Sequence, residues 1–343
     1  MGMSREQGIK TVYDGPSHVV ILGAGASISS NIHNPEPSGR QLPSMANFLD
    51  IVDLTDIVEN IDANGDIKNF ETIYSVLYSQ DPGSPVLIEI EERVRDYFQS
   101  LALPPTPTIY DYLVLSLRSK DIIATFNWDP FLYKAFCRNH HVGDLPRITF
   151  LHGSVSVGYS VQEQKAGPAG WFSKTTGDEY VPTKLLYPVT QKNYNDDEFI
   201  RREWDRLKRG LETAKRMTIF GYSAPDSDVE AAGLMRGAWG DPNQRNLEQI
   251  EFIDILPEEV MMERWDSFVY PGHHEYKTDY FDSVLAYFPR RTGESFMHQF
   301  LPSTEDEALQ EPNIVPRSFG TLEEMWEWYR PLVEAENQQL SNR

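Results

Sequence analysis

Four clusters of glycine and small polar residues follow short apolar segments of the chain, and their residue types could do chemistry. The clusters are Gly23-Ala24-Gly25-Ala-Ser27, Asn127-Trp-Asp129, His152-Gly-Ser154 and Gly221-Tyr-Ser223. Glycines between a strand and a helix let backbone N–H groups approach a phosphate, and the N-terminus of the following helix adds positive potential. Because a side-chain amide both donates and accepts hydrogen bonds, Asn127 could orient a sugar hydroxyl together with a water molecule.

His152 is the histidine whose sequence context suggests catalysis. It directly follows the apolar segment 147–151, so we expect its ring at the edge of a sheet, partly exposed. With an ordinary pKa of about 6.5, an imidazole in that position could act as a general base or relay a proton. A purely structural role is the alternative for His152. Asp129 has two open interpretations, a ligand contact and an N-terminal cap of a helix that starts near Pro130.

Short apolar segments alternate with amphipathic helices along most of the chain. The expected strands are 17–22, 121–125, 147–151, 217–220 and 251–255, the last clear one, whereas the pattern assigns no element to 155–190. This alternation predicts an α/β fold with a Rossmann-like parallel sheet and helices on both of its faces. Since ligands bind at the carboxyl ends of the strands in such sheets, the four clusters are expected to converge.

The glycine cluster is an incomplete match to the dinucleotide-binding fingerprint. Ile28 stands where the third glycine would be, and the acidic residues at the usual distance, Asp50 and Asp53, lie in a helical pattern. These departures disfavour a dehydrogenase and leave a plain tight turn as the alternative for the glycines.

The chain is expected to divide into an α/β domain over 1–270 and a C-terminal extension over 271–343. Helical periodicity from about 45 to 100 predicts a helical insertion in the first part. The extension is expected to end in a helix over 321–340, with Trp328 exposed opposite its apolar stripe. An exposed tryptophan of this kind favours contact with another subunit or a partner protein.

The composition excludes several classes of partner. The chain has 31 Lys and Arg against 52 Asp and Glu, a formal net charge of −21, which disfavours nucleic acid and membrane surfaces as direct partners. Its apolar stretches are far shorter than the roughly 18–20 residues that span a bilayer, so we expect a cytoplasmic protein. The single cysteine, Cys137, cannot form a multi-cysteine zinc module.

Taken together and in this order, four segments resemble the sirtuin family, and more closely the sirtuin-like NAD hydrolase domains of prokaryotic antiphage defence systems. The segments are Gly23-Ala-Gly-Ala-Ser27, Thr125-Phe-Asn-Trp-Asp129, Leu151-His-Gly153 and Gly221-Tyr-Ser-Ala-Pro-Asp226, within 17–256. The resemblance implies that NAD phosphates are held by Gly23, Ala24, Gly25 and Ser27. It further implies that Asn127 orients ribose and water, that Asp129 contacts the nicotinamide carboxamide and that His152 is the catalytic histidine. Gly221 and Ser223 would line the adenosine ribose and phosphates, with Asp254 near the adenine.

The sequence also departs from the deacylating sirtuins. Those enzymes carry a four-cysteine zinc module, which Cys137 alone cannot supply, and a Gly-Ile-Pro-Asp-Phe-Arg continuation, where this chain has Gly39-Arg-Gln-Leu-Pro-Ser44. We therefore expect no zinc and no cofactor beyond NAD⁺ as substrate, and the departures put protein deacylation in doubt.

The resemblance implies an NAD⁺ glycohydrolase that releases nicotinamide and ADP-ribose, acting as the NAD-depleting effector of an antiphage defence system. Because constitutive loss of NAD would kill the host, we expect gating through a homo-oligomer or a partner such as an ATPase. The alternatives are a non-catalytic NAD or ADP-ribose sensor that signals to a partner, and an NAD-dependent protein deacylase or ADP-ribosyltransferase.

Overall fold

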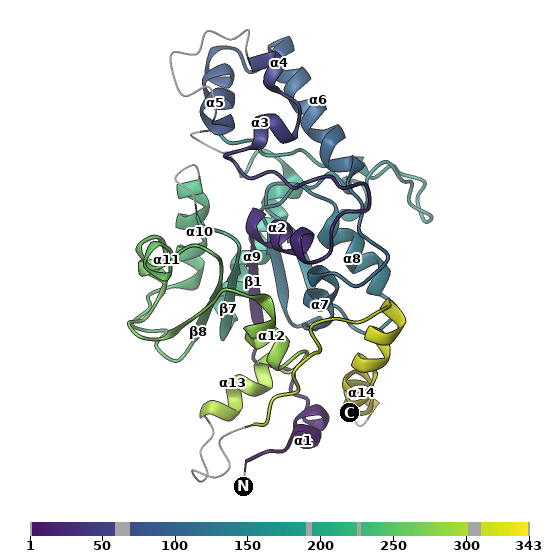
Figure 1. The fold of residues 1–343 in the computed structure, drawn as a ribbon, viewed down its shortest axis with the longest axis vertical. Coiled ribbons are helices and arrows are strands. Elements are labelled where there is room, and N and C mark those ends of the chain that lie inside the picture. The colour runs from purple at the N-terminus through teal and green to yellow at the C-terminus, as the bar shows by residue number, and fades with distance from the viewer. Residues whose placement is uncertain (1, 59–68, 190–193, 225–227, 301–309, 342–343) are drawn as a thin grey trace.

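A parallel six-stranded sheet forms the centre of the molecule (Figure 1). The computed structural model describes residues 2–58, 69–189, 194–224, 228–300 and 310–341. The strand order is β3-β2-β1-β7-β8-β9, and every neighbouring pair is parallel. The strands are β1 (His18–Leu22), β2 (Ile122–Thr125), β3 (Arg147–Phe150), β7 (Arg216–Phe220), β8 (Gln249–Ile253) and β9 (His274–Lys277).

The five expected strands are confirmed, and the sheet has a sixth strand, β9, which the sequence pattern does not indicate. β1 and β7 are buried along their whole length, as is typical of parallel strands covered on both faces, so their apolar runs reveal them in the sequence. β9 lies beyond residue 270 and pairs with β8. Its residues His-Glu-Tyr-Lys are only partly buried, and an edge strand of that composition carries no apolar signal. The sheet therefore continues past the expected domain boundary.

Helices cover both faces of the sheet, as the sequence predicts for a Rossmann-like α/β fold (Figure 1). Alternate residues of β1 point to opposite faces, so Val20 and Leu22 belong to one apolar core, and Val19 and Ile21 to the other. The first core includes side chains of α2 (Ala24–His33), α7 (Ile109–Leu115), α8 (Phe131–Asn139), α12 (Val284–Tyr287) and α14 (Leu322–Ser341). The second includes side chains of α9 (Glu198–Thr213), α10 (Val229–Trp239) and α11 (Glu258–Trp265).

The helical insertion is present and lies at the top of Figure 1. Its helices are α3 (Phe48–Ile51), α4 (Thr55–Val58), α5 (Phe70–Gln80) and α6 (Pro85–Ser100); residues 59–68 of the insertion lie outside the described residues. Phe48 stacks on Phe70 with ring centroids 4.2 Å apart, and the edges of Phe48 and Phe98 meet Trp128. Since Trp128 follows Asn127 directly, the insertion packs next to one of the four clusters.

The segment 155–190, which has no clear sequence pattern, contains a small antiparallel sheet. Its strand order is β5-β4-β6, with β4 (Val157–Ser160), β5 (Lys165–Pro168) and β6 (Val181–Pro182). The strands are short and β5 and β6 are largely exposed, so neither an apolar run nor a regular alternation marks them.

The C-terminal residues pack on the rest of the chain through a buried ion cluster. The remaining elements are α1 (Arg5–Lys10), α13 (Thr292–Phe300) and the 3₁₀ helices η2 (Asp266–Phe268) and η3 (Tyr280–Asp282). On α14, the buried Glu336 accepts hydrogen bonds from Arg290 and Arg291, whose guanidinium groups are also buried. The expected exposure of Trp328 is wrong, because its ring is half-buried against Phe319 and Tyr329.

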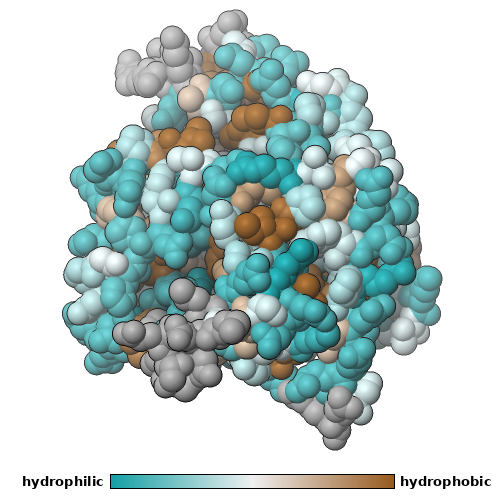
Figure 2. Space-filling model, turned by 60° about the horizontal axis from the view of Figure 1, so that its bottom comes forward, coloured by the Kyte–Doolittle hydropathy of each residue, from teal (hydrophilic) through white to brown (hydrophobic). Residues whose placement is uncertain are grey.

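The visible surface is mostly hydrophilic (Figure 2), as expected for a chain with 24% charged residues. On the face in Figure 2, hydrophilic residues predominate and the apolar residues form separate patches. Among the described helices, none combines the length and the apolar character that a membrane crossing needs.

Replacing Glu336 by glutamine is expected to destabilise the protein strongly. Burial alone would raise the pKa of Glu336, but the hydrogen bonds and charges of Arg290 and Arg291 outweigh it and lower that pKa below 4.5. Glu336→Gln leaves two buried guanidinium groups without an anion, which costs about 3–5 kcal/mol in the free energy of unfolding at pH 7. Urea unfolding measures this loss.

The matched control is Glu334→Gln, on an exposed position of the same helix, with an expected change below about 0.5 kcal/mol. Because the folded-state pKa of Glu336 is lowered, its stabilisation is present above about pH 4.5 and is lost as the pH falls further. The difference between wild type and Glu336→Gln should therefore shrink in acid. Equal unfolding midpoints for the two variants at pH 7 would contradict the assignment.

Candidate functional site

Three glycines allow the turn after β1 to pack directly on the end of β7. The Gly23 N–H donates to the Phe220 carbonyl at 3.1 Å, and the Gly25 N–H donates to the Gly221 carbonyl at 3.0 Å. A Cβ on Gly23 would lie 2.4 Å from the Gly221 oxygen, and one on Gly221 would lie 2.1 Å from the Ala26 nitrogen. Gly221 also has a φ of +61°, in the left-handed region that favours glycine. No side chain fits at this contact, so the glycines have a structural role.

This contact lies where the order of the strands reverses. From β1 the chain goes outward to β2 and β3, and it then returns to β7 on the other side of β1. In open parallel sheets the carboxyl ends of two such strands frame a crevice in which ligands bind. Ala24 is exposed here as the first residue of α2, whose N-terminus carries positive potential.

A buried polar network lies beneath the glycine turn. Asn127 donates from its Nδ2 to the Gly23 carbonyl at 2.8 Å and to the Ser27 Oγ at 3.0 Å. Ser27 Oγ also contacts the Tyr110 hydroxyl at 2.5 Å and donates to Asp129 Oδ2 at 2.6 Å. With three partners, the Ser27 hydroxyl has its full set of hydrogen bonds, so in this structure it serves the packing of the turn.

Asp129 lies one residue before the N-cap of α8, which is Pro130, and its carboxylate accepts from the first N–H group of the helix. Asp129 Oδ1 accepts from the Phe131 N–H at 3.0 Å, at the start of α8, while Oδ2 accepts from Ser27. The side chain is buried, and burial raises the pKa of its carboxyl above the ordinary value, against the opposing hydrogen bonds from Ser27 and Phe131. Both carboxylate oxygens therefore have protein partners, and a contact with a ligand stays a prediction.

His152 belongs to a second network, at the end of β3. Its Nε2 lies 3.3 Å from the Tyr194 hydroxyl and 3.9 Å from Asp228 Oδ1, and Tyr222 donates to Asp228 Oδ2 at 3.1 Å. Burial raises the pKa values of Tyr194 and Tyr222, and the charge of Asp228 raises them further, so both phenols stay protonated. The expected partial exposure of His152 is wrong: the residue is only 5% exposed.

Phe126 connects the two networks and explains the burial of His152. Its ring meets His152 edge-on at 4.8 Å and stacks on Tyr222 at 4.2 Å between ring centroids. Phe126 precedes Asn127 in the chain, and Tyr222 follows Gly221. The structure thus brings all four clusters together at the carboxyl edge of the sheet.

Two of the sequence-predicted residues lie at the margin of this site. Ser223 is half-buried, and its carbonyl accepts from Arg264 at 2.9 Å. Asp254 is half-buried just after β8, where its Oδ1 accepts from the Leu256 N–H at 2.9 Å and forms a local turn. Pro225 and Asp226 of the fourth segment lie outside the described residues.

The sequence analysis missed Tyr110, Tyr194 and Asp228. Tyr110 belongs to the apolar stripe of α7, and Tyr194 follows a segment without a clear pattern. The local sequence around these two tyrosines therefore does not indicate a role in the site. Asp228 lies seven positions after Gly221 in a polar stretch, where only the fold shows which carboxylate meets His152.

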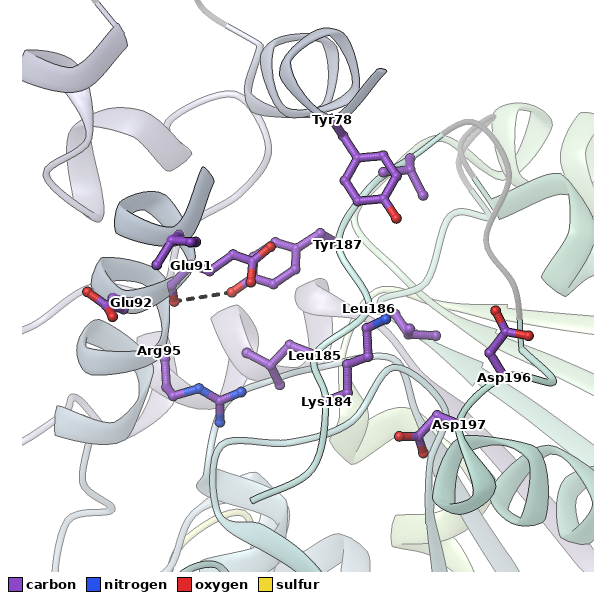
Figure 3. Close-up of a pocket in the computed structure, with 12 residues that line it drawn as sticks. Tyr78, Glu91, Glu92, Arg95, Lys184, Leu185, Leu186, Tyr187, Asp196 and Asp197 are labelled. Atoms are coloured by element: carbon purple, nitrogen blue, oxygen red, sulfur yellow. Dashed lines mark hydrogen bonds between the residues drawn. The ribbon is translucent and has the colours of Figure 1, made fainter. Parts of the chain in front are cut away.

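A cavity of about 310 Å³ adjoins the site (Figure 3). It is lined from the insertion by Tyr78, Ile88, Glu91, Glu92 and Arg95, and from the α/β core by Lys184, Leu185, Leu186, Tyr187, Val189, Asp196 and Asp197. The Leu186 N–H donates to the His152 carbonyl at 3.0 Å, and the Tyr187 ring packs on Trp128 at 4.9 Å. The segment that walls the cavity therefore also supports the clusters around His152 and Asn127.

The strand order, with helices on both faces of the parallel sheet, defines a Rossmann-like α/β protein. No protein-family model and no curated protein matches the chain. Among solved structures, the chain is similar to one described as "Structural Basis for the Mechanism and Regulation of Sir2 Enzymes", with 12% identity, a TM-score of 0.40, and 98% of this chain and 96% of that chain covered.

A Sir2 homolog–NAD complex has 14% identity and a TM-score of 0.39, with 86% of this chain and 93% of that chain covered. An S24A mutant of a Sir2 homologue in complex with ADP-ribose has 14% identity and a TM-score of 0.37, with 77% and 94% covered. At these identities and TM-scores, the similarity does not by itself assign an activity to the chain.

Replacing Gly221 by alanine tests the glycine contact. The added Cβ meets backbone atoms of Gly25 and Ala26 and must adopt a positive φ, so Gly221→Ala is expected to lower the free energy of unfolding by about 2 kcal/mol or more. Gly233→Ala is the control, because Gly233 lies inside α10 with open space around it. There alanine should stabilise the protein by up to about 1 kcal/mol. Equal effects in urea unfolding would contradict the assigned contact.

Proposed function

We propose that this chain is an NAD⁺ glycohydrolase, which cleaves NAD⁺ with water into nicotinamide and ADP-ribose. The observation that carries the proposal is the convergence of the glycine turn, Asn127 and His152 at the reversal point of the sheet. The ordered sequence segments that resemble sirtuin-like NAD hydrolases support the same activity.

The pyrophosphate of NAD⁺ would bind at the start of α2. Gly23 and Gly25 keep this turn free of side chains, and the exposed Ala24 leaves the helix N-terminus accessible. Backbone N–H groups and the helix dipole favour an anion there. The net charge of −21 repels an anionic ligand. The attraction that binds the pyrophosphate therefore has to come from the backbone N–H groups in direct contact with it.

The reaction needs a positioned ribose, a positioned water and a proton acceptor. The bond between ribose C1′ and the nicotinamide nitrogen breaks, and its electron pair leaves with neutral nicotinamide. The water oxygen forms the new bond to C1′ and releases one proton. In this proposal Asn127 orients the ribose and the water, and His152 accepts the proton, directly or through a ribose hydroxyl, before it passes to solvent.

The biological setting in the proposal comes from the resemblance. An enzyme that depletes NAD has to be held inactive until it is needed, so we propose a gated antiphage effector whose activity depends on a homo-oligomer or on a partner such as an ATPase.

The central test incubates the purified full chain with NAD⁺ and measures nicotinamide and ADP-ribose. Asn127→Ala and His152→Ala are each expected to lower the rate by about 100-fold or more, because each removes a group that acts on the reacting ribose or water. The matched controls Asn246→Ala and His140→Ala change exposed residues outside the C-terminal helix and should retain the wild-type rate. Unchanged turnover in the Asn127 and His152 variants would contradict the assignment.

The same measurements separate the alternatives. Calorimetric binding of NAD⁺ or ADP-ribose without any nicotinamide release would favour a sensor that signals to a partner. A mass change on an acylated peptide that requires NAD⁺ would favour a deacylase.

A further inference from the structure

We propose that Tyr110 is a positioning residue of this site: through Ser27, and through a longer direct contact, its hydroxyl fixes the amide of Asn127 so that the carbonyl Oδ1 faces the ligand. Asn127 then acts on the ligand as a hydrogen-bond acceptor. The identity of the ligand rests on the proposed function, whereas the orientation of the amide rests on the hydrogen bonds alone.

The direction of each hydrogen bond at Ser27 follows from the donors available. A serine hydroxyl has one hydrogen to donate and two lone pairs to accept. Ser27 donates its hydrogen to Asp129 Oδ2, so its contact with Tyr110 at 2.5 Å requires that Tyr110 donates. Burial raises the pKa of Tyr110, and the charge of Asp129 raises it further, so the phenol keeps the proton that this bond needs.

These directions leave one orientation for Asn127. The Ser27 oxygen has one lone pair left, which accepts from Asn127 Nδ2 at 3.0 Å, and the second Nδ2 hydrogen goes to the Gly23 carbonyl at 2.8 Å. The Tyr110 hydroxyl lies 3.3 Å from the same Nδ2 and is a further, longer acceptor for it. The opposite orientation would place the amide oxygen 2.8 Å from the Gly23 carbonyl oxygen, with two acceptors in contact. Within the described part of the chain, Oδ1 is then the side-chain atom of the half-buried Asn127 that remains to meet a ligand.

The fold holds Tyr110 rigidly in place for this role. Tyr110 lies in α7, which begins at a capping box formed by Thr108 and Asp111 and packs against α2. Tyr110 is only 1% exposed, so its hydroxyl is shielded from bulk water. Loss of this hydroxyl leaves a lone pair of Ser27 unsatisfied and lets the serine turn away from Asn127.

Tyr112 provides a matched control on the same helix. It is also 1% exposed, and its hydroxyl makes no hydrogen bond to any described residue. Tyr110→Phe and Tyr112→Phe therefore remove the same atom from equally buried positions of α7, but only the first removes a bond to the network.

Steady-state kinetics of the full chain with NAD⁺ compare these variants. Tyr110→Phe is expected to lower kcat about tenfold with KM within about twofold of wild type, because the amide is needed where the ribose and water react rather than where the pyrophosphate binds. Tyr112→Phe should keep both constants. Equal kcat values for the two variants would overturn the positioning role.

A second readout does not depend on turnover. The side-chain NH₂ signal of Asn127 in the ¹⁵N NMR spectrum, identified by its loss in Asn127→Ala, should exchange with solvent faster in Tyr110→Phe and as slowly as wild type in Tyr112→Phe. Ser27→Ala removes the central hydroxyl and should give the same acceleration, which keeps the test available if Tyr110→Phe does not fold. Unchanged exchange in Ser27→Ala and Tyr110→Phe overturns the inference. Faster exchange without turnover in any form of the chain supports the positioning role and rejects the proposed function.

Discussion

The contact between the turn after β1 and the end of β7 is the constraint on which the site depends. Backbone meets backbone there, since a Cβ on Gly23 or Gly221 would overlap the opposite segment. β1 and β7 pair as neighbouring strands, and this approach continues their backbone contact past the strand ends to the start of α2. It also places the Gly23 carbonyl within reach of Asn127, so the geometry of the polar network follows from the absence of side chains at the turn.

Burial of the polar side chains in the two networks is tolerated because these side chains are partners of one another. Ser27 and Asp129 are almost inaccessible, and their hydrogen bonds connect α2, α7 and the start of α8. Near His152, the protonated phenols of Tyr194 and Tyr222, together with Asp228, likewise provide hydrogen-bond partners for buried groups. Such networks are costly when one member is missing, so they hold a single arrangement of the site. The cavity between the insertion and the core adjoins this rigid part.

The sequence could predict those features that depend on local pattern. Fully buried strands such as β1 and β7 appear as apolar runs, and the segments that follow them contain the glycines and polar residues of the site. The sequence could not predict β9, because the partly buried residues of this strand form no apolar pattern. Nor could it predict the burial of His152, which results from contact with Phe126 in a different segment. The half-burial of Trp328 likewise depends on Phe319.

By itself, therefore, the sequence determined the class of fold, the helical insertion and the four clusters at the ends of strands, because periodicity and glycine placement are local properties. Only the tertiary structure decided which side chains meet there. Tyr110 lies 83 positions from Ser27, and Asp228 lies 76 positions from His152, since 110 − 27 = 83 and 228 − 152 = 76. Hydrogen bonds across such separations depend on how helices pack against the sheet, and local patterns of residue types do not predict that packing.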